Sequence, residues 1–208
     1  PIRDLLKLDF DLLQADVPEE QKPQLKTTKE GADSILQFFQ QRAETVMSEH
    51  GVGYDILNAV SRVGLRRGDL AGAFRRAVVL QKYRANEGFA KLRAGFTRSA
   101  NIIRNAVGAE QKEEAPARVD EALLVDASER ELYKELQQVE TRVRPLTDAG
   151  DFQAALEEAS KLTPYIDAFF DSVMVLDKDE KLRNNRIALL ERIVALTADI
   201  GDISQIVE

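Results

Sequence analysis

The stretch DAFFDSVMVLDKDEKLRNNRIALLERI, residues 167–193, joins an apolar run directly to a run of charged and amide side chains. Apolar residues recur at helical spacing on both sides of its charged centre, which predicts a helix near 164–176 and another near 179–199. Because each residue advances a helix by about 100°, Arg183 and Arg186 fall within the apolar arc of the second helix. The apolar residues of the first helix are predicted to belong to the core: Phe169, Phe170, Val173 and Met174. The stretch therefore predicts two consecutive helices that meet at a packed corner.

Two acidic residues lie on one face of the first of these helices. Asp167 and Asp171 are one turn apart, so their charges repel each other unless a cation lies nearby. The economical interpretation is an ion-paired corner, in which Arg186 pairs with Asp167 or Asp171 and either Asp177 or Asp179 caps the second helix. In this interpretation Asp167, Asp171 and Arg186 are structural residues.

The start of the second helix also allows a functional interpretation. Arg183, Asn184 and Asn185 are candidate nucleotide contacts, since the backbone N–H groups at a helix N-terminus favour phosphate. Asn184 and Asn185 rotate outward on the predicted helix, so this interpretation and the ion-paired corner can both hold. Acid–base hydrolysis by the carboxylate pair is disfavoured, because no His, Cys or metal cluster accompanies it.

The rest of the chain repeats the same pattern. Long amphipathic periods are separated by Gly, Pro and Asp, and no sustained alternation of period two is present. The pattern predicts an all-α fold, a multi-helix bundle of about eight to nine antiparallel helices. The expected helices lie near 2–14, 33–50, 54–63, 69–85, 87–107, 127–149, 151–162, 164–176 and 179–199.

Two polar segments divide the chain. We expect an N-terminal helix and linker over 1–30, then a helical domain over 31–208 whose two layers are joined by the linker GAEQKEEAPAR, 108–118. Gly150 suits the position after a helix end, and Asp151 suits the N-cap of the next helix. Because the sequence starts with Pro rather than Met, we expect it to be a fragment of a longer chain.

Composition excludes several classes of site. The 208 residues contain no Cys and one His, which excludes disulfides, thiolate metal sites and any site that needs two imidazoles. We therefore expect no metal site and no catalytic residue. His50 precedes Gly51 at an expected helix end, where an imidazolium would face the carbonyl end of the helix dipole. Because a chain without Cys fits a reducing compartment, we expect a cytoplasmic protein. No stretch approaches the roughly 18 consecutive apolar residues of a membrane span, so we expect no membrane contact.

The net charge of −7 conceals a reversal in the middle of the chain. Residues 60–107 contain only Asp69 and Glu87 as acidic residues, against a much larger set of basic ones. The basic residues are Arg62, Arg66, Arg67, Arg75, Arg76, Lys82, Arg84, Lys91, Arg93, Arg98 and Arg104. Such a cluster suggests a surface for a polyanion on an otherwise acidic body. Alternatively, these arginines pair with acids of the second half and form an ordinary solvated surface.

The expected helix near 87–107 separates apolar from polar side chains. Its apolar stripe consists of Phe89, Leu92, Phe96 and Ile103. The candidate RNA contacts of this helix are Lys91, Arg98, Asn101, Arg104 and Asn105. Arginine and asparagine at adjacent turns suit RNA, because a guanidinium pairs with phosphate or stacks on a base while an amide hydrogen-bonds to base edges. We expect Arg98, Asn101 and Arg104 to be the main contacts.

Several motifs follow one another along the chain. The first half contains F-F-x-x-R at 38–42, G-x-x-Y-D-I-x-x-A-V at 51–60 and R-x-x-N-I at 98–102. The second half contains a block with Leu123, Leu124, Glu129 and Leu132, then D-A-F-F-D-S-V-M-V and D-x-x-L-R-x-N-R-I-A-L-L, which ends at Leu190. In this order the motifs resemble the C-terminal DALR-type anticodon-binding region of bacterial glycyl-tRNA synthetase beta subunits.

The resemblance implies a helical domain that docks the anticodon arm of glycine tRNA as part of glycine–tRNA ligase, an aminoacyl-tRNA synthetase. It implies that the alpha subunit, reached through the rest of the beta chain, carries out aminoacylation with ATP and Mg, and that this chain has no cofactor of its own. Arg98, Asn101, Arg183, Asn185 and Arg186 match motifs of the family. The alternative is a helical protein–protein scaffold that binds no RNA and uses its acidic second half as the interface.

Overall fold

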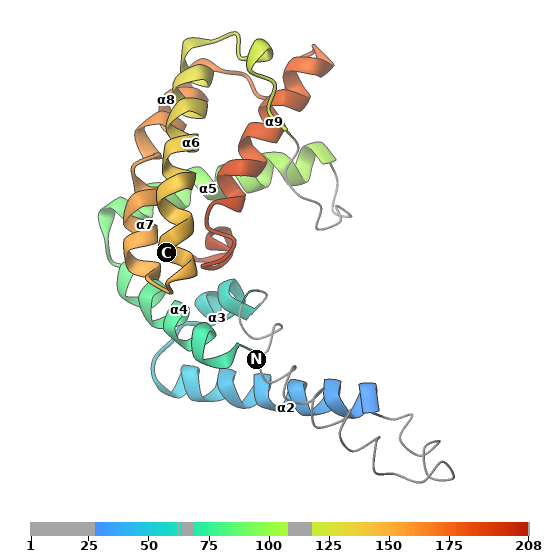
Figure 1. The fold of residues 1–208 in the computed structure, drawn as a ribbon, viewed down its shortest axis with the longest axis vertical. Helices are drawn as coiled ribbons and strands as arrows, with labels where there is room; N and C mark the ends of the chain where they lie inside the picture. Colours follow the sequence, from blue (N-terminus) through green and yellow to red (C-terminus); the bar gives the residue numbers. More distant parts are fainter. Residues whose placement is uncertain (1–27, 62, 64–68, 108–117, 208) are drawn as a thin grey trace.

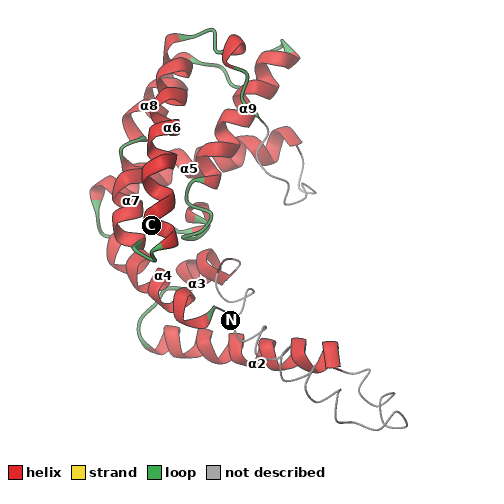
Figure 2. Cartoon of the chain, in the orientation of Figure 1, coloured by secondary structure: helices red, strands yellow, loops and turns green. Residues whose placement is uncertain are grey.

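The computed structural model describes residues 28–61, 63, 69–107 and 118–207 (Figure 1). These residues form helices and connecting loops without a strand (Figure 2), so the predicted all-α class is confirmed. The elements are α2 (Thr28–Glu49), α3 (Tyr54–Val60), α4 (Leu70–Tyr83), α5 (Glu87–Val107), η3 (Glu121–Leu123), α6 (Ala127–Asp148), α7 (Phe152–Ser160), α8 (Thr163–Ser172), α9 (Glu180–Ala195) and η4 (Ile203–Gln205). The predicted helix near 2–14 and nearly all of the predicted linker 108–118 lie outside the described residues. None of the described helices has both the length and the apolar character needed to cross a membrane.

Helix α5 lies at the centre of the fold. It packs against α7, α8, α9 and η4, while α6 packs against α7 and α8. Helix α4 connects this body to α2 and α3, and α2 lies at one end of the elongated molecule (Figure 1). One continuous core includes Phe89 and Phe96 of α5, Leu136 of α6, Leu156 of α7 and Phe169 of α8. The core fixes α5 with one side buried and the other side exposed.

Aspartate side chains begin several of the helices. Asp69, Asp126, Asp151 and Asp179 are the N-caps of α4, α6, α7 and α9, and each accepts a hydrogen bond from a backbone N–H of the first turn. Gly150 follows the end of α6 with φ 76°, a left-handed conformation that glycine adopts at little cost. The predicted turn at Gly150 and Asp151 is therefore confirmed, as is Asp179 as the cap of α9.

The single histidine stabilises the end of α2. His50 Nδ1 donates to the carbonyl oxygen of Val46 at 2.7 Å, and its ring meets Phe74 of α4 edge-to-face with 6.3 Å between ring centres. The predicted structural role of His50 at a helix end is confirmed. Within the described ranges, no three His, Asp or Glu side chains come together in a way that could hold a metal ion.

Helices α8 and α9 are shorter than predicted. Helix α8 ends at Ser172 because Val173 adopts extended backbone, with φ −117° and ψ 125°. Successive side chains alternate sides in an extended segment, so Val173 and Val175 are buried while Met174 between them is 76% exposed. The predicted core position of Met174 is therefore wrong. Helix α9 ends at Ala195 rather than near 199, where the chain turns into a C-terminal segment.

This C-terminal segment, residues 196–207, returns to α3. The N–H of Asp202 donates to the carbonyl oxygen of Ala59 at 2.9 Å, and the N–H of Val207 donates to Asp55 Oδ2 at 2.9 Å. Its element η4 packs on both α3 and α5. The segment therefore links α3 to α5.

Candidate nucleic-acid interface

The exposed side of α5 carries the polar residues that the sequence placed there. Lys91, Arg98, Asn101, Arg104 and Asn105 are all exposed, whereas Phe89, Leu92 and Phe96 of the same helix are buried. We call these five exposed side chains the α5 face. A shallow groove of about 590 Å³ runs along it and is lined by Arg93, Ala94, Thr97, Arg98, Asn101, Ile102 and Asn105. Helical periodicity therefore separated the two sides of α5 correctly, and RNA contact by the α5 face stays a prediction.

Arg98 is held on an aromatic ring. Its Cζ lies 4.1 Å from the centre of the Phe170 ring, which comes from α8 and is 9% exposed. A guanidinium over a ring face gains a cation–π interaction of about 0.5–1 kcal/mol at an exposed site. Among the described residues no carboxylate pairs with Arg98. The Phe170 ring thus supports the Arg98 side chain beside the groove.

Arg104 and Asn101 form a unit of their own. Arg104 Nη2 donates to Asn101 Oδ1 at 2.5 Å, and Arg104 Nε donates to the carbonyl oxygen of Ala100 at 3.4 Å. The two residues are three positions apart and therefore neighbours on the helix surface. The guanidinium lies back along α5 and fixes the side-chain amide of Asn101.

Other arginines of the basic region have structural roles. Arg76, Arg84 and Arg93 each donate to a backbone carbonyl oxygen of the C-terminal segment, at 2.8, 2.9 and 3.1 Å. Arg76 also pairs with Asp69 at 3.1 Å, and Arg84 pairs with Asp55 at 3.3 Å. The expectation of one broad basic surface is therefore wrong for these three residues, which hold the fold together.

Three more members of that basic set, Arg62, Arg66 and Arg67, lie outside the described residues. The exposed basic residues of α5 that remain are Lys91, Arg98 and Arg104. The candidate surface is consequently narrower than the charge count of the sequence suggested.

Asn185 differs from its prediction. It is 6% exposed, and its side-chain amide makes two bonds with one residue of the segment before η3. Its Nδ2 donates to the carbonyl oxygen of Asp120 at 3.0 Å, and its Oδ1 accepts from the N–H of Asp120 at 2.7 Å. The prediction that Asn185 faces outward as an RNA contact is wrong, because both ends of the amide are used inside the fold.

The N-terminus of α9 has few free hydrogen-bond donors for a phosphate. Asp179 Oδ1 already accepts from the N–H groups of Lys181 and Leu182, at 2.8 and 3.3 Å, so these backbone donors are used by a carboxylate. Arg183 is partly buried, and its Nη1 donates to the carbonyl oxygen of Asp177 at 3.1 Å. Asn184 is exposed, as predicted from its rotation. A phosphate site on the backbone of this helix end is disfavoured by the negative charge of its cap.

Arg186 is the centre of a buried ion-pair network. Its Nε donates to Glu129 Oε1 at 2.6 Å, and its Nη1 donates to Asp177 Oδ2 at 2.8 Å and to the carbonyl oxygen of Met174 at 3.0 Å. Burial acts to lower the pKa of the Arg186 guanidinium, but the bonds to Glu129 and Asp177 outweigh it and raise the pKa. Arg186 therefore stays charged and ties α9 to α6 and to the loop after α8.

The predicted partners of Arg186 were wrong. Asp167 and Asp171 are exposed on α8, where solvent screens their repulsion. Glu129, whose side chain is fully buried, takes their place, and its second oxygen accepts from the N–H of Asp126 at 2.7 Å. The sequence held a signal for this position, because Asp126 followed by Glu129 is the spacing of a helix capping box.

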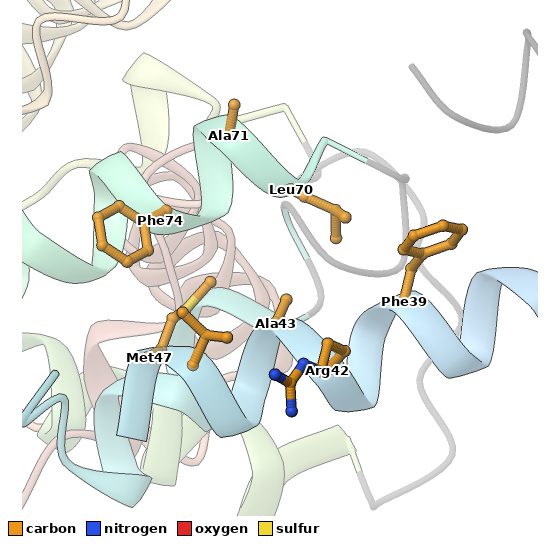
Figure 3. A pocket seen from close by; sticks show the side chains of 8 residues that line it. Phe39, Arg42, Ala43, Met47, Leu70, Ala71 and Phe74 are labelled. Atoms are coloured by element: carbon orange, nitrogen blue, oxygen red, sulfur yellow. The ribbon is translucent and has the colours of Figure 1, made fainter. Parts of the chain in front are cut away.

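A second groove lies between α2 and α4 and has a different character (Figure 3). It measures about 330 Å³ and is lined by Phe39, Arg42, Ala43, Val46, Met47, Leu70, Ala71 and Phe74. Figure 3 shows Phe39 and Phe74 at its two ends, with Leu70 between them on α4. Arg42 is the only charged residue of this lining. The groove thus presents apolar surface, whereas the groove on α5 presents hydrogen-bond donors.

A comparison with protein families matches the part of the chain that carries Arg98, Asn101, Arg104 and Asn105 of the α5 face. The family model described as DALR anticodon binding domain matches residues 92–203, which run from α5 to η4. This span is more than half of the chain. The chain belongs to the DALR anticodon-binding domain family. The resemblance inferred from the sequence motifs is thereby confirmed for this DALR domain.

Relatives extend the similarity of the DALR domain toward the N-terminus. A glycine–tRNA ligase beta subunit of Moorella thermoacetica is 39% identical over 175 residues, which are 84% of this chain and 24% of the relative. That of Acidobacterium capsulatum is 34% identical over 191 residues, 90% of this chain and 27% of the relative. That of Citrifermentans bemidjiense is 32% identical over 206 residues, 99% of this chain and 27% of the relative. The chain spans about a quarter of the length of these curated relatives.

Proposed function

We propose that this chain binds the anticodon arm of glycine tRNA as one part of a glycine–tRNA ligase beta subunit. The observation that carries the proposal is the α5 face, where arginine and asparagine donors meet no described carboxylate and lie inside the DALR domain. Phosphate contacts by the basic residues would position the arm, and base contacts would supply the sequence reading. Bases of a single-stranded loop can be splayed out, stacked on a guanidinium and read on their edges.

The rest of the proposal concerns the longer protein. The chain would contribute binding and orientation, while the alpha subunit, reached through the rest of the beta chain, would carry out aminoacylation with ATP and Mg. The described residues contain one His and no metal-binding cluster, so the proposal assigns them no chemical step. The whole assembly would act in the cytoplasm, where tRNA is charged.

A filter-binding titration tests the proposal. Glycine tRNA and a copy with an altered anticodon are titrated with the chain at about 50 and 200 mM salt. Binding should weaken steeply at the higher salt, and the altered anticodon should bind less well. Arg98→Ala should weaken binding about tenfold and reduce the salt dependence by about one phosphate contact, with unchanged helicity.

The matched control is Arg144→Ala, which removes an exposed arginine from α6. This change should leave the affinity close to that of the parent chain. A salt-insensitive interaction, or equal losses for Arg98→Ala and Arg144→Ala, would contradict binding through the α5 face.

The apolar groove between α2 and α4 favours a second, compatible role. We infer that another segment of the beta-subunit polypeptide covers it. Phe39 and Phe74 at this groove are 40% and 37% exposed, and Phe38 beside it is 63% exposed. Helices α2 to α4 precede the DALR match at residue 92, yet the 206-residue similarity to a beta subunit includes them. Three quarters of such a subunit is available to cover these rings.

Hydrogen exchange tests this second role. Amides of α2 and α4 should exchange more slowly in a full-length beta subunit than in this chain alone, while α6 should exchange equally in both. Equal exchange of α2 in the two proteins would show that nothing in the longer polypeptide covers the groove.

A further inference from the structure

We propose that Arg104 sets the specificity of the α5 face by fixing the orientation of the Asn101 side-chain amide. The fixed amide turns its NH₂ group outward, so the centre of the face presents hydrogen-bond donors. Such a face selects nucleobase edges with two adjacent acceptors. This inference rests on the proposed RNA binding and goes beyond it by naming the class of base edge that is read.

The chemistry of the Arg104 contact decides which atom of Asn101 it meets. A guanidinium has five N–H donors and no acceptor. The atom of Asn101 that lies 2.5 Å from Arg104 Nη2 must therefore be the carbonyl oxygen Oδ1. Rotating the amide by half a turn would place two donors against each other. The bond to Arg104 consequently fixes which end of the Asn101 amide faces outward.

Arg104 is itself placed by α5. Its Nε donates to the carbonyl oxygen of Ala100 at 3.4 Å, which keeps the guanidinium against the helix beside Asn101. Hydrogen bonds with a charged donor are roughly twice as strong as those between neutral groups. An exposed asparagine would otherwise populate both orientations of its amide. Arg104 therefore converts an adaptable side chain into one with a defined polarity.

A neighbouring side chain adds to the donors around Asn101. Arg98 lies one turn before Asn101 and is placed on the Phe170 ring, 4.1 Å from its centre, so it adds further donors to the same groove. Among the residues that the structure describes, no carboxylate pairs with Arg98 or Arg104. The centre of the groove thus combines the donors of Arg98 with the outward NH₂ of Asn101.

The complementary base edge must offer acceptors to these donors. Guanine offers the adjacent acceptors O6 and N7, whereas adenine places its N6 amino donor beside N7. Cytosine offers the acceptors O2 and N3, whereas uracil carries an N–H between its two carbonyl oxygens. A donor-presenting face therefore favours guanine or cytosine in a single-stranded loop and disfavours adenine and uracil.

Hairpin RNAs that differ only in one loop base test the proposal. Affinities for hairpins with cytosine or adenine at that position are measured by fluorescence anisotropy at one salt concentration. The parent chain should prefer cytosine about tenfold, as expected for one well-made base contact. Arg104→Met should bring the ratio close to one, because the freed Asn101 amide can offer either end. Arg104→Lys should keep the preference, since an ammonium also donates only.

A double-mutant cycle separates this role from a general loss of charge. In an Asn101→Leu background, Arg104→Met should not change the cytosine-to-adenine ratio further, because the amide that Arg104 orients is gone. If Arg104→Met lowers both affinities equally and preserves the ratio, the inference is overturned while the proposed RNA binding stands. If the parent chain binds no hairpin at all, the proposed function and the inference fall together. Circular dichroism of each variant checks that α5 remains helical.

Discussion

Arg186 and Arg98 are both arginines, but one stabilises the fold and the other is a candidate for binding RNA. Arg186 is 7% exposed, and its donors contact Glu129, Asp177 and a backbone carbonyl oxygen. Arg98 is exposed and rests on the ring of Phe170, and no described residue accepts a hydrogen bond from its guanidinium. The two arginines therefore differ in how many of their N–H groups are hydrogen-bonded within the protein. An arginine whose N–H groups are hydrogen-bonded within the fold stabilises the protein. An arginine whose N–H groups have no described partner can bind another molecule.

The strongest way to break this comparison is to remove Arg186. Arg186→Ala leaves the fully buried carboxylate of Glu129 without its cation, so the free energy of unfolding should fall by about 3–5 kcal/mol. Urea unfolding followed by circular dichroism measures the change. Arg183→Ala, one turn earlier, removes an arginine with one backbone bond and should cost much less. If Arg186→Ala lowers the free energy of unfolding as little as Arg183→Ala does, the Arg186 network contributes little to stability.

The contact beneath Arg98 can be changed without touching its charge. Phe170→Leu keeps an apolar side chain in the core but removes the aromatic ring, and should reduce the free energy of unfolding by about 1 kcal/mol. RNA affinity should also fall because Arg98 loses its support, while the slope of affinity against salt should stay the same because the charge is still present. A reduced slope, measured by titration at several salt concentrations, would show that a charged contact to phosphate is lost when the ring is removed.

Acid tests the Arg186 network through its second carboxylate. The N–H of Asp179 and then the Arg186 guanidinium hold the pKa of Asp177 below its usual value. The contribution of Asp177 to stability is therefore complete above about pH 4, its unfolded pKa, and is lost as pH falls through the lower pKa of the folded state. Asp177→Asn should make the urea midpoint fall less between about pH 5 and pH 3 than in the parent chain. An unchanged acid dependence would mean that the carboxylate is equally protonated in both states.

The smallest effect is expected where the sequence had placed the partner of Arg186. Asp171 is exposed, and the described residues give it no ion pair. Asp171→Asn should therefore change the free energy of unfolding by no more than about 0.5 kcal/mol in a urea titration. A decrease of several kcal/mol in the free energy of unfolding would instead support the predicted ion pair between Asp171 and Arg186.

Periodicity predicted the features that depend on one helix at a time. The two sides of α5, the burial of Arg186 and the caps at Asp151 and Asp179 all follow from rotation about a helix axis or from local turn chemistry. These features need no knowledge of the neighbouring helix. They were accordingly predicted from the residues alone.

Features that depend on a distant segment were missed. Rotation placed Arg186 inward but could not say that Glu129, 57 positions earlier, faces it. Asn185 was expected outside because it rotates outward on the predicted helix, yet the segment at Asp120, 65 positions away, covers it. Phe170 was assigned to the core, but its role as a platform for Arg98 requires knowing that α8 crosses α5. In each of these cases a segment distant in the sequence decides the contact or the burial of the side chain.

The C-terminal segment has a consequence for synthesis of the protein. Its last backbone contact joins Val207 to Asp55, 152 positions earlier, and arginines of α4 bind carbonyls 123 positions later. A ribosome delivers α3 and α4 well before these partners emerge. Part of the surface of α3 and α4 therefore stays uncovered until translation reaches residues 196–207.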